Sequence, residues 1–167
     1  MTETAEEPKV TYQQLAGAYA MRANFYLHMF DVLREAFGAE RAVDLIGEAT
    51  FRLGEQMGQK LKAHGPDNIE GLTEQFLAGI PCRDQLFQPE LRKCDAEGME
   101  IQFHRCPLKD TWTAEGREGE ELEQLCRAAG RIDAGMFGAA GFTFKGETWA
   151  PGKTGCCRLI VEPGPKA

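Results

Sequence analysis

Apolar side chains in the first eighty residues recur at steps of three and four, which is the spacing of one face of an α-helix. Thr11 and Gln14 fit the capping-box pattern, so we expect a helix to begin at Thr11 and to end at Gly38. Its apolar positions form two neighbouring stripes, and a face this wide predicts burial on more than one side. The same period continues over residues 42–61, so the two segments predict a helical hairpin.

Three glycines, Gly47, Gly54 and Gly58, lie inside the second predicted helix. Each costs about 1 kcal/mol relative to alanine in a helix, so a compensating contact is expected. We expect close packing of the helix backbone against a neighbour, and the alternative is a ligand that approaches the helix. Further along the chain, Asn68 can cap a short third helix that ends at Gly79.

After residue 84 the pattern changes to short segments with alternating apolar and polar positions, which is typical of strands. The predicted elements are a hairpin of strands over 86–94 and 99–106, a loop through Pro107 and Trp112, a helix over 118–136, and two strands over 142–144 and 157–161. This order predicts the α+β class: an N-terminal helical hairpin plus a short helix, then a small antiparallel sheet with one packed helix. We expect a single domain over residues 11–163, preceded by a disordered tail over residues 1–10.

The chain carries 26 acidic and 19 basic residues, and its formal charge is −7. No dense run of Lys or Arg is present, so binding to nucleic acid or to a membrane surface is disfavoured. The N-terminus is acidic rather than basic and apolar, and no run of about 20 apolar residues occurs. The six cysteines are therefore expected to be free thiols in a cytoplasmic protein.

Candidate chemistry begins at His104 and Cys106, which lie two residues apart in a predicted strand and so face the same way. Pro107 ends the strand and leaves Cys106 accessible, and the imidazole could stabilise the reactive thiolate. The alternative is a half-buried cysteine beside an exposed histidine.

Asp133 lies seven residues after Cys126, on the same face of the predicted helix. A carboxylate on the buried side of a helix needs a partner, and the alternative is that Asp133 is solvated at a fraying helix end. Cys156 and Cys157 are adjacent, so only one of them is expected to face a site on this strand. Trp112 and Trp149 either form the wall of a pocket or anchor their loops.

Three segments, 104–108, 125–133 and 155–159, resemble the family named for L-2-amino-thiazoline-4-carboxylate hydrolase. That resemblance covers about residues 12–162 and implies hydrolysis of a cyclic amidine, a non-peptide carbon–nitrogen bond, to an N-carbamoyl amino acid. The family's last cysteine is usually followed by an acidic and then an aromatic residue, whereas Arg158 and Leu159 follow Cys157 here. This difference bears on the substrate more than on the fold.

The positions that match the family are Cys106, Cys126, Cys157 and Asp133. Cys106 could add to the amidine carbon with help from His104, or Asp133 could orient a water for direct attack. The prediction is therefore a small-molecule site without a cofactor, whose catalytic residues are Cys106, His104, Asp133 and Cys126 and whose substrate contacts are Cys157, Trp112 and Arg158.

Two other functions remain open at this stage. The clustered cysteines could belong to a sensor or carrier module that binds a metal, an iron–sulfur cluster or a small hydrophobic ligand, with Cys106, Cys126 and Cys157 as ligands. The wide apolar face of the first helix also suggests a module that forms a homodimer.

Overall fold

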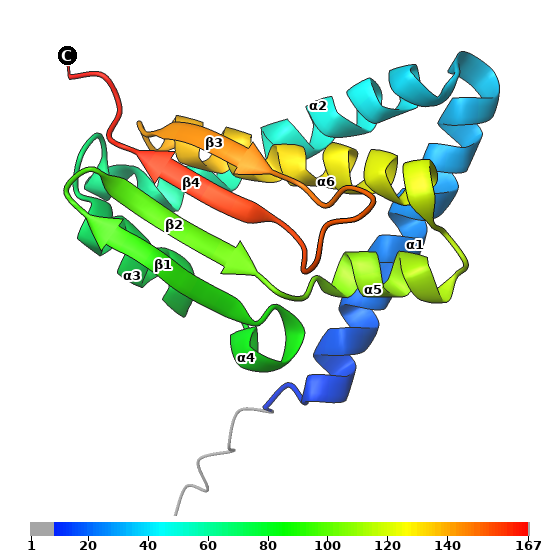
Figure 1. Cartoon of the computed structure of the whole chain (residues 1–167), viewed down its shortest axis with the longest axis horizontal. Coiled ribbons are helices and arrows are strands. Elements are labelled where there is room, and N and C mark those ends of the chain that lie inside the picture. Colours follow the sequence, from blue (N-terminus) through cyan, green and yellow to red (C-terminus); the bar gives the residue numbers. More distant parts are fainter. Residues whose placement is uncertain (1–8, 167) are drawn as a thin grey trace, which may run out of the picture.

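A computed structural model describes residues 9–166 of the chain. Of the tail predicted over residues 1–10, only Lys9 and Val10 are among the described residues, and both are exposed. The described chain folds as two layers, in which helices cover one face of a four-stranded sheet (Figure 1). The predicted α+β class is confirmed.

The N-terminal helices begin where the sequence predicts. Helix α1, Tyr12–Phe37, starts with a complete capping box, in which the Thr11 hydroxyl accepts from the Gln14 backbone N–H and the Gln14 side chain accepts from the Thr11 N–H. Gly38, with a φ of 87°, joins it to helix α2, Ala39–Gly58, and a 3₁₀-helix, η1, follows over Gln59–His64. Asn68 caps helix α3, Ile69–Ala78, by accepting from the Gly71 N–H.

The sheet has the strand order β1-β2-β4-β3, and every neighbouring pair is antiparallel. Its strands are β1, Pro89–Asp95; β2, Gly98–Phe103; β3, Thr143–Glu147; and β4, Arg158–Glu162. The buried side chains lie on the face toward the helices, among them Met99, Ile101, Leu159 and Val161. The opposite face carries polar side chains such as Glu100 and Arg158.

Two local predictions are wrong. Strand β2 ends at Phe103, so the strand predicted to reach Cys106 is three residues too long. Pro107 then opens helix α5, Pro107–Ala114, where a loop was expected, because a proline is well suited to the first position of a helix. The short helix α4, Arg83–Leu86, was also not predicted, whereas α6, Gly119–Ala139, corresponds to the helix predicted over 118–136.

Helices α2 and α6 pack backbone to backbone, and glycines make this possible. A Cβ added at Gly54 would collide with the carbonyl oxygen of Ile132, and one at Gly58 would collide with that of Met136. From the other side, a Cβ on Gly135 would meet the carbonyl of Phe51. Close packing against the backbone of α6 therefore explains Gly54 and Gly58, whereas a Cβ on Gly47 would come closest to the side chain of Arg131, at 3.1 Å.

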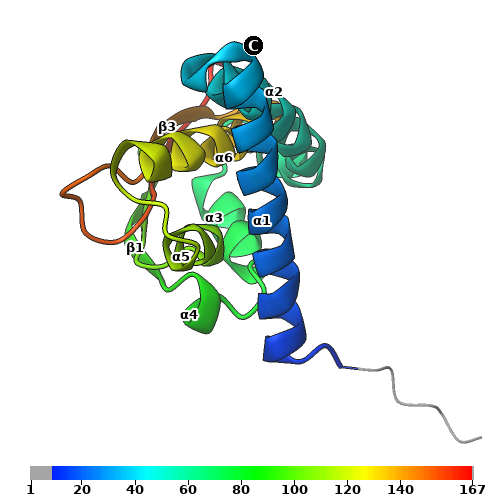
Figure 2. The same cartoon turned by 90° about the vertical axis from the view of Figure 1, so that its right-hand side faces the viewer.

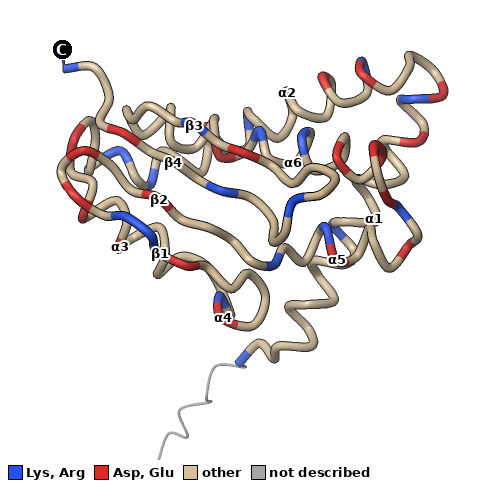
Figure 3. The backbone as a smooth tube through the Cα atoms, viewed as in Figure 1, with Lys and Arg blue, Asp and Glu red and all other residues tan. Residues whose placement is uncertain are grey.

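The apolar core consists of two clusters. One lies among α1, α2, α5 and α6 and includes Phe30, Ile46 and Trp112, and the other lies between α3, α6 and the sheet. Cys106 packs against both clusters, so it marks the point where they meet. Basic and acidic residues are mixed over both layers (Figure 3), and none of the described helices is long and apolar enough to cross a membrane.

Candidate functional site

A cavity of about 460 Å³, which we call the thiol cavity, lies where the two core clusters meet. Helices α1, α3, α5 and α6, the segment 79–87 and the residues just before β4 line it. Most of its wall is apolar, and the aromatic contributions come from Tyr19, Phe76, Phe87, Phe103 and Trp112. Its volume suits a small organic molecule.

Four thiols reach this cavity from three parts of the chain: Cys106 at the start of α5, Cys126 in α6, and Cys156 and Cys157 before β4. Backbone hydrogen bonds hold the residues before β4 against the end of β2, close to Cys106 in the chain. The Cys156 N–H donates to the Phe103 carbonyl, and the Phe103 N–H donates to that of Cys157. The Sγ atoms of Cys156 and Cys157 lie 3.7 Å apart. The structure thus brings Cys106, Cys126 and Cys157, the three cysteines proposed from the sequence, to one cavity.

Three of these thiols, those of Cys106, Cys126 and Cys156, are held in their neutral form. The neighbouring Cys156 thiol and burial raise the pKa of Cys106 well above its usual range, and burial does the same to the pKa of Cys126. For Cys156, the hydrogen bond with Cys106 lowers the pKa, but Cys157 and burial raise it more, to about 12. Because the thiolate is the reactive form, these three groups are weak nucleophiles.

Asp133 is the titratable group that distinguishes the cavity. It lies on α6 and lines the wall, and burial raises its pKa to about 7. Within residues 9–166 its carboxyl group has no hydrogen bond or ion pair. Asp133 is half-buried in the cavity wall, the described chain supplies no partner for its carboxylate, and the group is available to a ligand.

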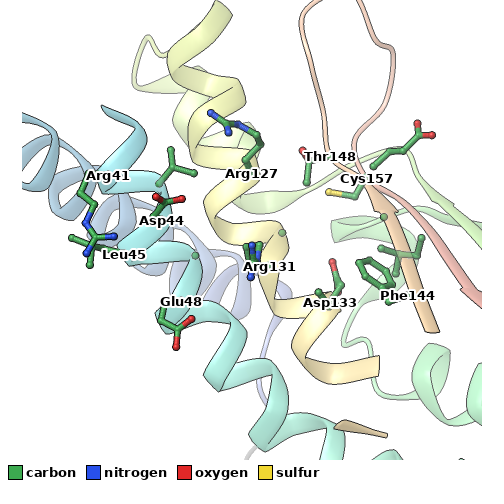
Figure 4. A pocket seen from close by; sticks show the side chains of 17 residues that line it. Arg41, Asp44, Leu45, Glu48, Arg127, Arg131, Asp133, Phe144, Thr148 and Cys157 are labelled. Atoms are coloured by element: carbon green, nitrogen blue, oxygen red, sulfur yellow. The ribbon is translucent and has the colours of Figure 1, made fainter. Parts of the chain in front are cut away.

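A second, more polar cavity of about 670 Å³ adjoins the first between α2, α6 and β3. Gly130, Asp133 and Cys157 line both cavities, so this is where the two meet. Figure 4 shows Asp133 extending from α6 toward the side on which Phe144 and Cys157 lie. Charged side chains line the remainder of the second cavity: Arg41, Asp44, Glu48, Arg127, Arg131 and Glu147. Asp133 thus lies between an apolar chamber and a polar one.

A family model described as L-2-amino-thiazoline-4-carboxylic acid hydrolase matches residues 18–161. The chain belongs to this family. Among solved structures, it is similar to the crystal structure of the phenol-responsive sensory domain of the transcription activator PoxR with phenol, with a TM-score of 0.50 and 16% sequence identity over 94% of this chain and 78% of that one. At this identity the likeness shows a shared fold. No curated protein matches the chain in sequence.

In this member of the hydrolase family, two predicted site residues lie outside the thiol cavity. His104 follows the end of β2, is exposed, and pairs through Nε2 with the Glu90 carboxylate at 2.8 Å, so it does not assist Cys106. Arg158 donates to Glu100 at 2.9 Å on the polar face of the sheet. The sequence predicted that the His104 side chain would face the same way as Cys106, as alternate residues of a strand do. This prediction is wrong because the strand ends before His104.

Trp112 lines the cavity from α5 rather than from a loop. Its indole N–H donates to the Ala23 carbonyl of α1 at 2.8 Å, and its side chain is almost fully buried. It therefore anchors α5 to α1 as well as forming part of the wall.

Sequence reasoning missed Cys156 and Tyr19. Cys156 was assigned to a strand face turned away from Cys157, but both residues precede β4 in an irregular segment, where strand alternation does not apply. Tyr19 lies on the inner face of α1, and burial raises the pKa of its hydroxyl. Its helical spacing from Ala23 and Tyr26 was the one signal available.

The arrangement of thiols and carboxylates in this hydrolase-family chain does not fit a metal cage. Over the described residues, no three His, Cys, Asp or Glu side chains are grouped so that they could hold a metal ion. The groups that the structure places at this cavity are Asp133, the four thiols and the aromatic wall.

Proposed function

We propose that this chain hydrolyses a small cyclic amidine in the thiol cavity, with Asp133 as the general base. The observation that carries the proposal is the carboxyl group of Asp133, which has no partner among the described residues, lines the cavity and has a pKa of about 7. A general base is most effective when its pKa lies near the operating pH. Membership of the family named for L-2-amino-thiazoline-4-carboxylic acid hydrolase supports this choice of substrate class.

The reaction follows from the position of the carboxylate. An amidine enters protonated and pairs with the Asp133 carboxylate, and a water adds to its electrophilic carbon as Asp133 accepts the proton of that water. The bond from this carbon to the ring sulfur then breaks, so the bond cleaved is carbon–sulfur and not the carbon–nitrogen bond that the family resemblance implies. The sulfur leaves as a thiol with the proton that Asp133 returns. The proton carried in by the amidine goes to solvent as the carbonyl forms. Both nitrogens stay on that carbon, which gives an N-carbamoyl product.

Direct attack by water is favoured over a covalent route through Cys106. The raised pKa of Cys106 keeps it protonated, and no described basic side chain pairs with it. We assign the four thiols to the wall that shapes the chamber around the sulfur-containing ring. Lys60, which is exposed at the rim, supplies a positive charge for the substrate carboxylate.

The test is turnover of L-2-amino-thiazoline-4-carboxylate by the full chain, followed by mass spectrometry of the N-carbamoyl product. Asp133→Asn keeps the shape of the side chain and is expected to lower kcat by about 100-fold or more, because the general base is lost. Arg158→Gln, whose side chain lies outside the cavity, is the matched control and should retain turnover. Wild-type turnover by Asp133→Asn would refute the assignment of the base.

A Cys106→Ser variant separates the two routes. Direct attack by water predicts that this variant keeps kcat within about tenfold of the wild type, since a serine preserves most of the wall. A covalent route predicts a loss as large as that of Asp133→Asn, because a serine hydroxyl in this environment has no base to activate it.

A second candidate function is the sensing of a small aromatic ligand. The specific observation in its favour is the wall of five aromatic side chains around the cavity, and the similar solved structure is described as a phenol-responsive sensory domain. Calorimetric titration with phenol and with the thiazoline decides between the two. Binding of phenol without turnover of the thiazoline would favour the sensor.

A further inference from the structure

Helix α1 carries a second apolar face that no other part of the described chain covers. Its inner face is buried through Ala23, Tyr26, Leu27 and Phe30. On the outer face, Met21 is 74% exposed, Phe25 68% and Val32 65%. Figure 2 shows α1 running along the outside of the molecule with its outer side free. Large apolar residues exposed in a row, rather than singly, indicate an interaction surface.

The exposed positions follow a heptad. Steps of four and three connect seven residues that are all exposed, which we call the outer seam: Gln14, Ala18, Met21, Phe25, His28, Val32 and Glu35. This alternation is the a/d spacing of a coiled coil, and the seam is about 32 Å long. A partner that matches it is a helix with the same repeat, and a second copy of α1 provides one.

Charge complementarity selects this partner and its direction. Arg22 flanks the amino-terminal half of the seam, where its guanidinium donates to the Tyr26 hydroxyl at 3.3 Å, and Glu35 ends the carboxyl-terminal half. Neither forms an ion pair with another described residue. A parallel pair of helices would place each of these charges beside its own copy. An antiparallel pair brings Glu35 of one copy within a turn of Arg22 of the other, twice by symmetry. Antiparallel helices also oppose their macrodipoles favourably.

We propose that the outer seam is a homodimer interface in which two α1 helices pack antiparallel. The twofold axis passes between Phe25 and His28, so that Met21 of one copy packs on Val32 of the other. At the centre, Phe25 of each copy packs on His28 of the other. The seven seam residues lie outside the thiol cavity, although the flanking Arg22 is part of its wall, and the proposal does not depend on the enzymatic one. Each buried central Phe25 is the expected anchor of the interface.

Sedimentation equilibrium of the full chain at micromolar concentration tests the proposal. The expected mass is twice that of the 18.5 kDa chain. Phe25→Glu and Val32→Glu each place a charge in the seam and should raise the dissociation constant by about 30-fold or more. Phe37→Glu, at a residue that is 63% exposed but lies off the seam, is the matched control and should leave the dimer intact. Circular dichroism verifies that each variant is folded.

Cysteine cross-linking tests the direction. Mixing Met21→Cys chains with Val32→Cys chains should give a disulfide-linked mixed dimer above the wild-type background, whereas Met21→Cys alone should not. A monomeric wild type, or a dimer that persists in both seam variants, overturns the interface. Efficient cross-linking of Met21→Cys to itself overturns the antiparallel arrangement.

Discussion

Replacing Asp133 with Asn is expected to stabilise the protein at alkaline pH while it lowers kcat by about 100-fold or more. Burial raises the pKa of Asp133 from 3.8 to about 7, a shift of about three units. Each unit corresponds to about 1.36 kcal/mol, so the ionised carboxylate costs the folded state up to about 4 kcal/mol. Asn removes the charge and keeps the shape, so this cost disappears.

The pH dependence follows from linkage. Below about pH 4 the carboxyl is protonated in both the folded and the unfolded state, and it carries no cost. Between about pH 4 and 7 the unfolded state loses the proton first, so the free energy of unfolding falls as the pH rises. Above about pH 7 the group is ionised in both states and the full cost remains. The wild type and the variant should therefore be equally stable near pH 4 and differ most near pH 8.

Urea unfolding at both pH values measures this difference, because groups that the two proteins share contribute equally and cancel. Asp44→Asn, at an exposed carboxylate that lines the polar cavity, is the control and should leave stability unchanged within about 0.5 kcal/mol. Equal stability of the wild type and Asp133→Asn near pH 8 would show that the Asp133 carboxylate is well solvated, and the argument for a base with a raised pKa would be refuted.

Three further predictions concern packing and the outer residues. Gly54→Ala should lower the free energy of unfolding by about 1–3 kcal/mol in urea titrations, because its Cβ collides with the Ile132 carbonyl. The control Gly17→Ala, in open space on α1, should raise the free energy of unfolding by about 1 kcal/mol. A tolerated Gly54→Ala would contradict the tight packing of α2 on α6. Trp112→Phe removes the hydrogen bond to Ala23 and should cost about 1 kcal/mol in the same assay, and no loss would mean that this bond does not anchor α5. His104→Gln and Arg158→Gln should leave the affinity for the thiazoline within about twofold of the wild type by calorimetry, and a large loss for either would place it in the site.

Local signals in the sequence predicted much of the fold. The Thr11 capping box and the Asn68 cap mark helix starts because a side chain satisfies a backbone donor within a few residues. The glycines of α2 predicted close backbone packing because their conformational cost had to be compensated. Helical periodicity placed Asp133 and Cys126 on one face, and both line the thiol cavity.

What the sequence could not predict depends on where regular structure ends. Helix α5 is eight residues long, too short for a clear apolar period, so Trp112 was placed in a loop. The predicted directions of the His104 and Cys156 side chains assumed that both residues lie in strands. In the structure, β2 stops at Phe103 and β4 begins at Arg158, so neither residue is in a strand. The backbone hydrogen bonds between Phe103 and the segment before β4 join residues more than fifty positions apart, and no local pattern encodes them.

The most direct test of the central claim is the titration of the Asp133 carboxyl carbon by ¹³C NMR, with and without the thiazoline substrate analogue bound. We expect a midpoint near pH 7 in the free protein, and a lower midpoint in the complex because a bound amidinium stabilises the carboxylate. A midpoint near pH 4 in the free protein, or one that does not move when the ligand binds, would contradict the assignment of Asp133 to the ligand site.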